Sequence, residues 1–277
     1  MKGQEAPFGL DAGRVRTDRL GRLGPLAGVA RRYQRWNWGW RLEIALRYQP
    51  AVDALAGRPE ARRILDIGCG SKGGLTTYLG RPACGVDVTF DLERVHDHPL
   101  LTPVVASGLA LPLATASMDA VVCLDTVEHL TPAGRGALVA EMARVVRADG
   151  LLIVGAPCGE AARQAEARLA EEYRRRTGRV HPKLGEHLEH PVLSCDELAA
   201  LVEEAADRRF GRCRSQLIPN VNLRVWVALR RLFDLGRPLP GLTHLQRLLQ
   251  PFYPLMARRL HAEPVYRRVV IVSANDG

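Results

Sequence analysis

Residues 63–74 read RILDIGCGSKGG, and this stretch decides the fold of the chain. Residues 64–67 are apolar apart from one Asp and predict a short buried strand. Glycines then stand at positions 68, 70, 73 and 74, which predicts a tight turn that opens a helix. Their spacing fits G-x-G-x-x-G, a pattern in which the missing side chains let the backbone approach a ligand. The stretch therefore predicts a ligand-binding loop at the end of a strand.

Asp66, two residues before the first glycine, discriminates between two kinds of ligand. A carboxylate at this strand end suits a cofactor with a cationic amino group and a sulfonium, as in S-adenosylmethionine. It would repel the pyrophosphate of a dinucleotide. Residues 83–88 (ACGVDV) predict a second strand ending in Asp87. That Asp lies about 20 residues beyond the glycines, where an acidic side chain can bind both ribose hydroxyls.

Further motifs follow in order along the chain. Residues 106–130 read ASGLALPLATASMDAVVCLDTVEHL, and residues 143–158 read ARVVRADGLLIVGAPC. With the glycine loop and the acidic second strand, these segments resemble the class I S-adenosylmethionine-dependent methyltransferases, in particular the type 11-like small-molecule enzymes. The similarity rests on the LP and MD pairs, the EHL segment and the turn through Gly150 before the fifth strand. It is close over residues 62–157 and loose elsewhere.

This resemblance implies an α/β fold with a Rossmann-like, seven-stranded, mostly parallel sheet, helices on both faces and an antiparallel last strand. We expect an N-terminal arm and helical cap at residues 1–50 and a methyltransferase domain at residues 51–277. The domain would carry an acceptor-side insertion at residues 159–193 and a basic, apolar helical insert at residues 218–263, before the last strand.

The resemblance also implies that the chain binds S-adenosyl-L-methionine and releases S-adenosyl-L-homocysteine. The expected cofactor-binding residues are Asp66, Gly68, Cys69, Gly70, Gly73, Asp87, Val88, Ser107, Gly108, Leu109, Asp125, Thr126 and His129. Ser107 stands where many relatives have an Asp that bonds the adenine amino group. Contact with adenine through the Ser107 hydroxyl or through backbone groups of Gly108 and Leu109 therefore stays open.

The remaining secondary structure follows from periodicity and end signals. Helices are predicted at 26–48, 50–62, 132–146 and 161–176, and further strands at 119–124, 151–155, 209–217 and 265–273. Ser194, with Glu197 three residues on, predicts a capping box at the start of another helix. The stretch before Ser194 reads as a loop facing the acceptor.

Three histidines are candidates for the catalytic base, because the pKa of histidine lies near working pH. They are His129 in the EHL segment, and His187 and His190 in the predicted acceptor loop. Histidines and carboxylates in HLEH could also hold a metal. The acidic arrangement of the family's metal-dependent branch is missing, so we expect no metal site.

Composition narrows the class of protein and leaves its partner open. The 277 residues are 47% hydrophobic and 25% charged, with six cysteines and no C-x-x-C. With no apolar run of about 18 residues and no signal-peptide core, we expect a cytoplasmic protein. The net charge of +9 is concentrated in residues 1–50 and 208–268. Such basic flanks fit nucleic acid, an anionic membrane surface or a phosphorylated substrate, or simply reflect genome composition.

The leading functional hypothesis is O-methylation of a small-molecule or glycan- or lipid-linked acceptor in a biosynthetic, natural-product-like pathway. The insert at 218–263 would contact the inner face of a membrane, a second subunit as in a homodimer, or the main fold. An RNA methyltransferase is a second hypothesis, but no RNA-binding module is recognised. A third hypothesis is a protein that binds S-adenosylmethionine without transferring methyl, or an NAD-dependent oxidoreductase. Asp66 and the missing Tyr-x-x-x-Lys argue against the oxidoreductase.

Overall fold

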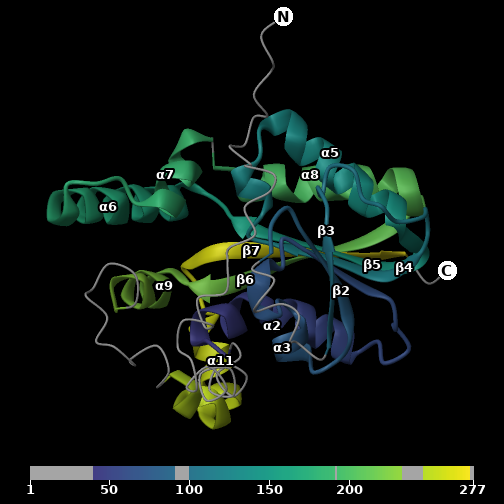
Figure 1. Ribbon diagram of the computed structural model, residues 1–277, viewed down its shortest axis with the longest axis horizontal. Coiled ribbons are helices and arrows are strands. Elements are labelled where there is room, and N and C mark those ends of the chain that lie inside the picture. The colour runs from purple at the N-terminus through teal and green to yellow at the C-terminus, as the bar shows by residue number, and fades with distance from the viewer. Residues whose placement is uncertain (1–39, 91–99, 191, 233–245, 275–277) are drawn as a thin grey trace, which may run out of the picture.

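A seven-stranded sheet forms the centre of the computed structural model, which describes residues 40–90, 100–190, 192–232 and 246–274 (Figure 1). The strand order is β3-β2-β1-β4-β5-β7-β6. β7 is antiparallel to both of its neighbours, and the other pairs are parallel. The strands are β1 Ile64–Ile67, β2 Ala83–Asp87, β3 Leu101–Val105, β4 Met118–Leu124, β5 Val146–Pro157, β6 Cys213–Asn222 and β7 Val265–Ala274. The predicted fold class is confirmed.

Helices cover both faces of this sheet. The α-helices are α2 Leu42–Ala56, α3 Thr76–Leu79, α5 Pro132–Val145, α6 Glu160–Thr177, α7 Pro182–Glu189, α8 Cys195–Phe210, α9 Leu223–Arg230 and α11 Tyr253–Leu260. The 3-10 helices are η2 Gly70–Lys72, η3 Val127–His129 and η5 Gln246–Phe252. In Figure 1, α5 and α8 lie above the sheet and α2 and α3 below it.

The central strand β4 joins the two halves of the core. Val121 and Cys123 pack into the cluster that includes α5 and α8, while Ala120, Val122 and Leu124 pack into the cluster that includes α2. All five side chains are buried, as a parallel strand covered on both faces requires. The apolar run that predicts this strand therefore reflects burial on two sides.

The sheet reverses its strand order between β1 and β4. From β1 the chain builds outward through β2 and β3, and it then returns to add β4 on the other side of β1. Open α/β sheets bind ligands beyond the carboxyl ends of the strands at such a reversal. The glycine loop after β1 and the residues after β4 both lie there.

The prediction of two helices that meet near Pro50 is wrong. One helix, α2, runs from Leu42 to Ala56 with Pro50 inside it. Leu46, Ala51 and Leu55 on this helix are fully buried. Their packing against the sheet outweighs the helix-breaking tendency of proline.

The loop predicted before Ser194 is partly a helix. Pro182 occupies the first turn of α7, and the His181 side chain caps it, since its Nδ1 accepts the Leu184 N–H at 3.2 Å. The capping box at the start of α8 is confirmed, with Ser194 and Glu197 bonded reciprocally. Because α8 continues to Phe210, β6 begins later than predicted and extends to Asn222.

A third apolar cluster joins the insert to the main fold. Trp226 of α9 is buried and stacks on Tyr266 of β7, with ring centroids 3.7 Å apart. Trp40, before α2, packs edge-on against Tyr253 of α11 at 5.8 Å. The expected insert at 218–263 thus begins inside β6 and packs against β7, while most of the expected cap at 1–50 lies outside the described residues.

No helix within the described ranges combines the length and the apolar composition needed to cross a bilayer.

Candidate functional site

The glycine loop makes a tight bend against the loop that follows β4. Gly68, Gly70, Gly73 and Gly74 all have positive φ angles, between 48° and 84°. A Cβ at Gly68 would overlap Thr126 Oγ1, whereas one at Gly70 would meet nothing within 4 Å. The backbone around Gly70 is therefore open to a ligand, while Gly68 is needed for close contact between the two loops.

Asp66, on β1, fixes the glycine loop through hydrogen bonds. Its buried carboxylate accepts the Leu75 N–H at 2.7 Å and the Tyr48 hydroxyl at 3.1 Å. Burial raises the pKa of Asp66 to about 7, although both hydrogen bonds oppose this shift. The structure thus gives Asp66 a bracing role, and its predicted contact with a cofactor's amino group stays a prediction.

The end of β2 lies beside the same loop. Asp87 accepts the Gly70 N–H through Oδ2 at 2.9 Å and the Thr89 N–H through Oδ1 at 3.2 Å. Val88 is 46% exposed, and the Ala106 N–H bonds the Asp87 carbonyl at 3.1 Å. The ends of β1, β2 and β3 therefore form one edge.

Most of the other predicted cofactor residues line this edge. Cys69 and Gly73 belong to the glycine loop, and the Cys69 side chain is buried. The Ser107 hydroxyl accepts a hydrogen bond from the Leu109 N–H at 3.2 Å and so stabilises the turn after β3. Gly108 packs closely on Ile67 and Leu138. This arrangement leaves open whether Ser107 or the neighbouring backbone contacts adenine.

Asp125, at the end of β4, is held by two arginines. Arg267 of β7 forms a bidentate pair with its carboxylate, and Arg47 Nε lies 2.9 Å from Oδ2. Burial alone would raise the pKa of Asp125, but the two guanidinium groups outweigh it and lower the pKa to about 2. Asp125 also has a positive φ of 56°. Neither arginine was predicted from the sequence; the two adjacent arginines inside the β-branched last strand were the available signal for Arg267.

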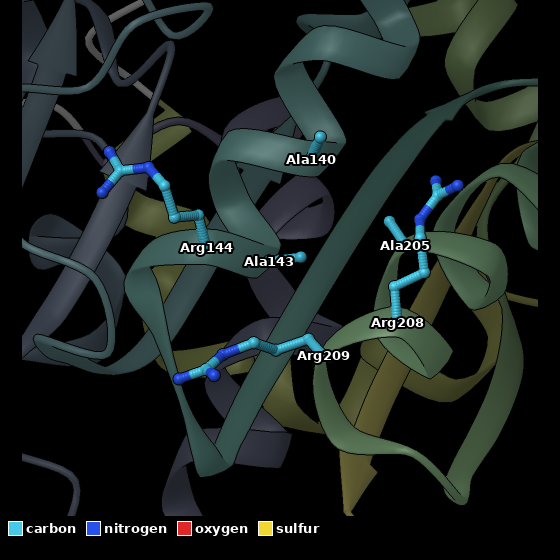
Figure 2. Close-up of a pocket in the computed structure, with 6 residues that line it drawn as sticks. All are labelled: Ala140, Ala143, Arg144, Ala205, Arg208 and Arg209. Atoms are coloured by element: carbon cyan, nitrogen blue, oxygen red, sulfur yellow. The ribbon is translucent and has the colours of Figure 1, made fainter.

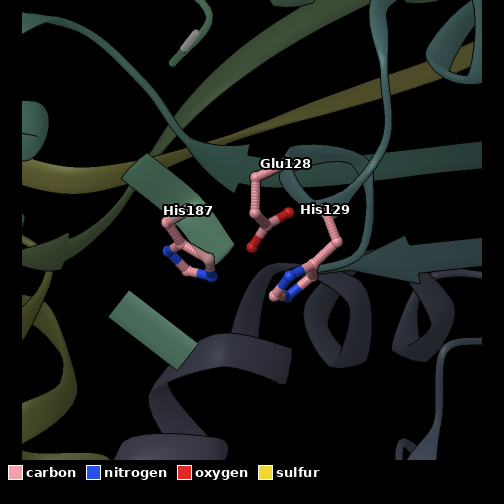
Figure 3. Close-up of side chains that lie close together, drawn as sticks. All are labelled: Glu128, His129 and His187. Atoms are coloured by element: carbon pink, nitrogen blue, oxygen red, sulfur yellow. The ribbon is translucent and has the colours of Figure 1, made fainter. Parts of the chain in front are cut away.

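A second polar cluster stands next to Asp125 (Figure 3). Potential ligand atoms of Glu128, His129 and His187 lie within 4.8 Å of one another, and the rings of the two histidines meet edge to face at 4.6 Å. His129 Nδ1 lies 3.4 Å from Glu186 Oε2. Two predicted catalytic residues, far apart in the sequence, are therefore brought together.

His190 is not part of this group of three. It caps the C-terminus of α7 and is partly exposed. Glu128, in contrast, was not among the predicted site residues, although it belongs to the EHL segment. Burial, followed by the charge of Asp125, raises the pKa of Glu128 to about 8.

His187 is anchored by a buried carboxylate. Its Nδ1 lies 2.7 Å from Glu166 Oε1, and the Tyr266 hydroxyl donates to the same oxygen. Burial alone would lower the pKa of His187, but the bond to Glu166 and the negative charges of Glu166, Glu128 and Asp125 together outweigh it and raise the pKa. The pKa of His129 is lowered by burial and by neighbouring His187.

A pocket between α5 and α8 lies away from this edge (Figure 2). Its arginines already make hydrogen bonds: Arg144 with the Leu111 and Leu113 carbonyls, Arg208 with Glu204, and Arg209 with the Val146 carbonyl. Val146 begins β5, so the pocket lies at the amino edge of the sheet. It does not belong to the candidate site.

Comparisons with known proteins agree with this geometry. A family model described as "Methyltransferase domain" matches residues 65–154. A Mycobacterium tuberculosis protein named "Probable S-adenosylmethionine-dependent methyltransferase" is 37% identical over 117 residues, which is 40% of this chain and 41% of that protein. The chain thus matches about two fifths of the length of this curated relative.

Two solved structures share the fold at low sequence identity. An S-adenosylmethionine-dependent methyltransferase from Archaeoglobus fulgidus has a TM-score of 0.52 at 17% identity, with 87% of this chain and 97% of that chain covered. A candidate methyltransferase of an antibiotic biosynthesis pathway in Anabaena variabilis has a TM-score of 0.51 at 18% identity, covering 83% and 99%.

The strand order and the glycine loop at its reversal define a Rossmann-like cofactor-binding sheet. The family match identifies a methyltransferase domain at residues 65–154, and the M. tuberculosis relative and the fold support a class I S-adenosylmethionine-dependent methyltransferase. The cofactor of this family is S-adenosylmethionine.

Proposed function

We propose that this chain transfers a methyl group from S-adenosylmethionine to a hydroxyl oxygen of a small-molecule, glycan- or lipid-linked acceptor in a biosynthetic pathway. One observation carries the proposal. Glu128 and His129 of the polar cluster lie two and three residues after Thr126, which packs against Gly68 of the cofactor loop, and His187 joins them from α7. The cluster and the glycine loop therefore share the edge at which ligands bind.

The residues at this edge fit the cofactor. The open backbone at Gly70 gives room for close approach, and Asp87 offers carboxylate oxygens beside it. Half-exposed Val88 provides an apolar surface next to these polar groups. When bound, S-adenosylmethionine supplies an electrophilic methyl group on a sulfonium.

The chain itself must align the acceptor and act on its proton. A protonated hydroxyl is a poor nucleophile, so a group that removes or polarises the proton speeds its attack. The cluster offers one carboxylate and two imidazoles for this task. His129 is the member that we place nearest the acceptor, because about a third of its side chain is exposed whereas His187 is buried.

A methyl-transfer assay tests this proposal directly. Release of S-adenosylhomocysteine is measured with hydroxyl, amine and carboxyl acceptors, and with structured RNA. We expect turnover with a hydroxyl acceptor, and a kcat at saturating cofactor that is reduced at least about 100-fold in His129→Gln. Tight cofactor binding without turnover on the whole panel would favour a binding protein, and turnover on RNA alone would favour an RNA methyltransferase.

The insert supports a lipid-linked acceptor met at the inner face of a membrane. Phe252 is 57% exposed at the end of η5, and Leu255 is 82% exposed on α11, with exposed Arg259 on the same helix. Exposed apolar side chains beside arginine favour an anionic lipid surface. We expect sedimentation with phosphatidylglycerol vesicles, lost in Leu255→Ser. If the wild type stays in the supernatant, the insert meets a soluble acceptor or a second copy instead.

A further inference from the structure

Glu128 is a buried carboxylate in the loop after β4. Glu128 is 5% exposed, and neither Oε1 nor Oε2 of its carboxylate has a hydrogen-bond partner in the described structure. A carboxylate taken out of water costs several kcal/mol unless a cation or hydrogen bonds compensate it. Figure 3 shows this carboxylate pointing between the rings of His129 and His187.

The ring of His187 is oriented so that one nitrogen faces Glu128. Its Nδ1 is engaged by Glu166, which is itself fixed by the Tyr266 hydroxyl. If Nδ1 carries the proton in this bond, Nε2 presents a lone pair on the other side of the ring. A carboxylate–histidine pair of this kind is the usual support of a metal-bound imidazole.

We propose that Glu128, His129 and His187 bind a divalent transition-metal ion through one carboxylate oxygen and two imidazole nitrogens. Mixed nitrogen and oxygen donors suit Mn²⁺, Fe²⁺ and Zn²⁺. The donor atoms lie within 4.8 Å of one another, so small side-chain rotations bring them to a shared ion. Because three protein ligands leave coordination positions free, the ion can also accept an acceptor oxygen on the exposed side of His129.

The local balance of charge agrees with a dication. Glu128 and Glu166 are both buried. Of the nearby arginines, Arg47 and Arg267 pair with Asp125, and the Nε of buried Arg135 donates to the Val127 carbonyl. No metal site was expected from the sequence, because the acidic arrangement of the family's metal-dependent branch is missing. The folded chain assembles a different donor set from η3 and α7, which no local motif reveals.

Mn²⁺ binding tests the site without cofactor or acceptor. After treatment with a chelator, the full chain is titrated with Mn²⁺, and the free ion is followed by electron paramagnetic resonance. Mn²⁺ prefers oxygen and nitrogen to thiolates, so the chain's cysteines do not compete. We expect one ion per chain, with spin-echo modulation from two coordinated imidazole nitrogens.

Matched variants locate the ion. Glu128→Gln and His187→Gln should each weaken binding at least about tenfold, and Glu166→Gln by about tenfold as a positioning residue. Glu189→Gln and His190→Gln, also on α7 or its cap, should leave the affinity unchanged. Urea midpoints establish that each variant is folded. The spin-echo modulation is measured on the wild-type chain, so it does not depend on the folding of any variant.

Absence of binding, absence of imidazole modulation, or equal affinity in Glu128→Gln and Glu189→Gln would overturn the site. Its action on an acceptor oxygen rests on the proposed function, but ion binding does not. Turnover that persists in chelator would refute the action of the ion on the acceptor while leaving methyl transfer standing. Ion binding without turnover on any acceptor would leave the metal site standing and refute the proposed function.

Discussion

Two glycines of the cofactor loop give a matched test of the contact between the loops after β1 and β4. Gly68 and Gly70 have similar positive φ angles of 73° and 62°. They differ in surroundings, since a Cβ at Gly68 would overlap Thr126 Oγ1 and lie 3.1 Å from Thr126 Cβ, while one at Gly70 would meet nothing within 4 Å. Alanine at each position separates backbone strain from steric overlap.

The expected magnitudes follow from these surroundings. Left-handed backbone costs a residue with a Cβ about 1–2 kcal/mol, so Gly70→Ala should lose about that much stability. Gly68→Ala carries the same strain plus overpacking, which adds about 1–3 kcal/mol. Thr126→Ala removes the atom that overlaps most. The double variant should therefore regain about 1–3 kcal/mol relative to the sum of the two single changes.

Urea unfolding without cofactor measures these differences, with buried Trp226 as one reporter of the folded state. The four proteins of the cycle are compared at one pH, with Gly70→Ala as the strain control. Equal losses in Gly68→Ala and Gly70→Ala would refute the reasoning. So would a double variant no better than additive, because the close approach of Thr126 would then carry no energy.

Three other predictions concern single carboxylates and a cap. Asp87→Ala should weaken S-adenosylhomocysteine binding more than tenfold by calorimetry, since its carboxylate bonds the Gly70 N–H and is expected at the ribose; unchanged affinity would count against that site. Burial opposes ionisation of Asp119, but bonds from Arg63 outweigh it and lower its pKa to about 2 from 3.8. Its contribution of ~2 kcal/mol is therefore present above about pH 4 and lost towards pH 2, and Asp119→Asn should flatten that part of the stability–pH curve. Ser194→Ala should cost about 1 kcal/mol in urea unfolding, and no loss would mean that the capping box is not formed in solution.

The sequence predicts the sheet well because its signals there are local. Buried strands such as β4 appear as short apolar runs, and the glycine loop marks where the chain turns from β1 into α3. The parallel arrangement and the antiparallel last strand were predicted from resemblance to a family and not from the pattern itself. The helix α7 was missed because a histidine caps it and Gly185 interrupts its short apolar pattern.

The candidate site is less predictable because its contacts join distant segments. Arg267 pairs with Asp125 across 142 positions of sequence, and His187 meets Glu166 across 21. Residue types suggested His129 and His187 separately, but only the fold brings their rings together. Glu128 was overlooked because nothing in the sequence tells that both of its carboxylate oxygens lack a donor.

Tyr266 of β7 connects the insert with the polar cluster of the candidate site. Its ring stacks on Trp226 of the insert, and its hydroxyl bonds Glu166, the anchor of His187. A change in the insert that shifts Trp226 is therefore expected to move the His187 imidazole of the polar cluster. Substitutions in the insert would be constrained at this aromatic contact, while its solvent-facing positions stay free to change.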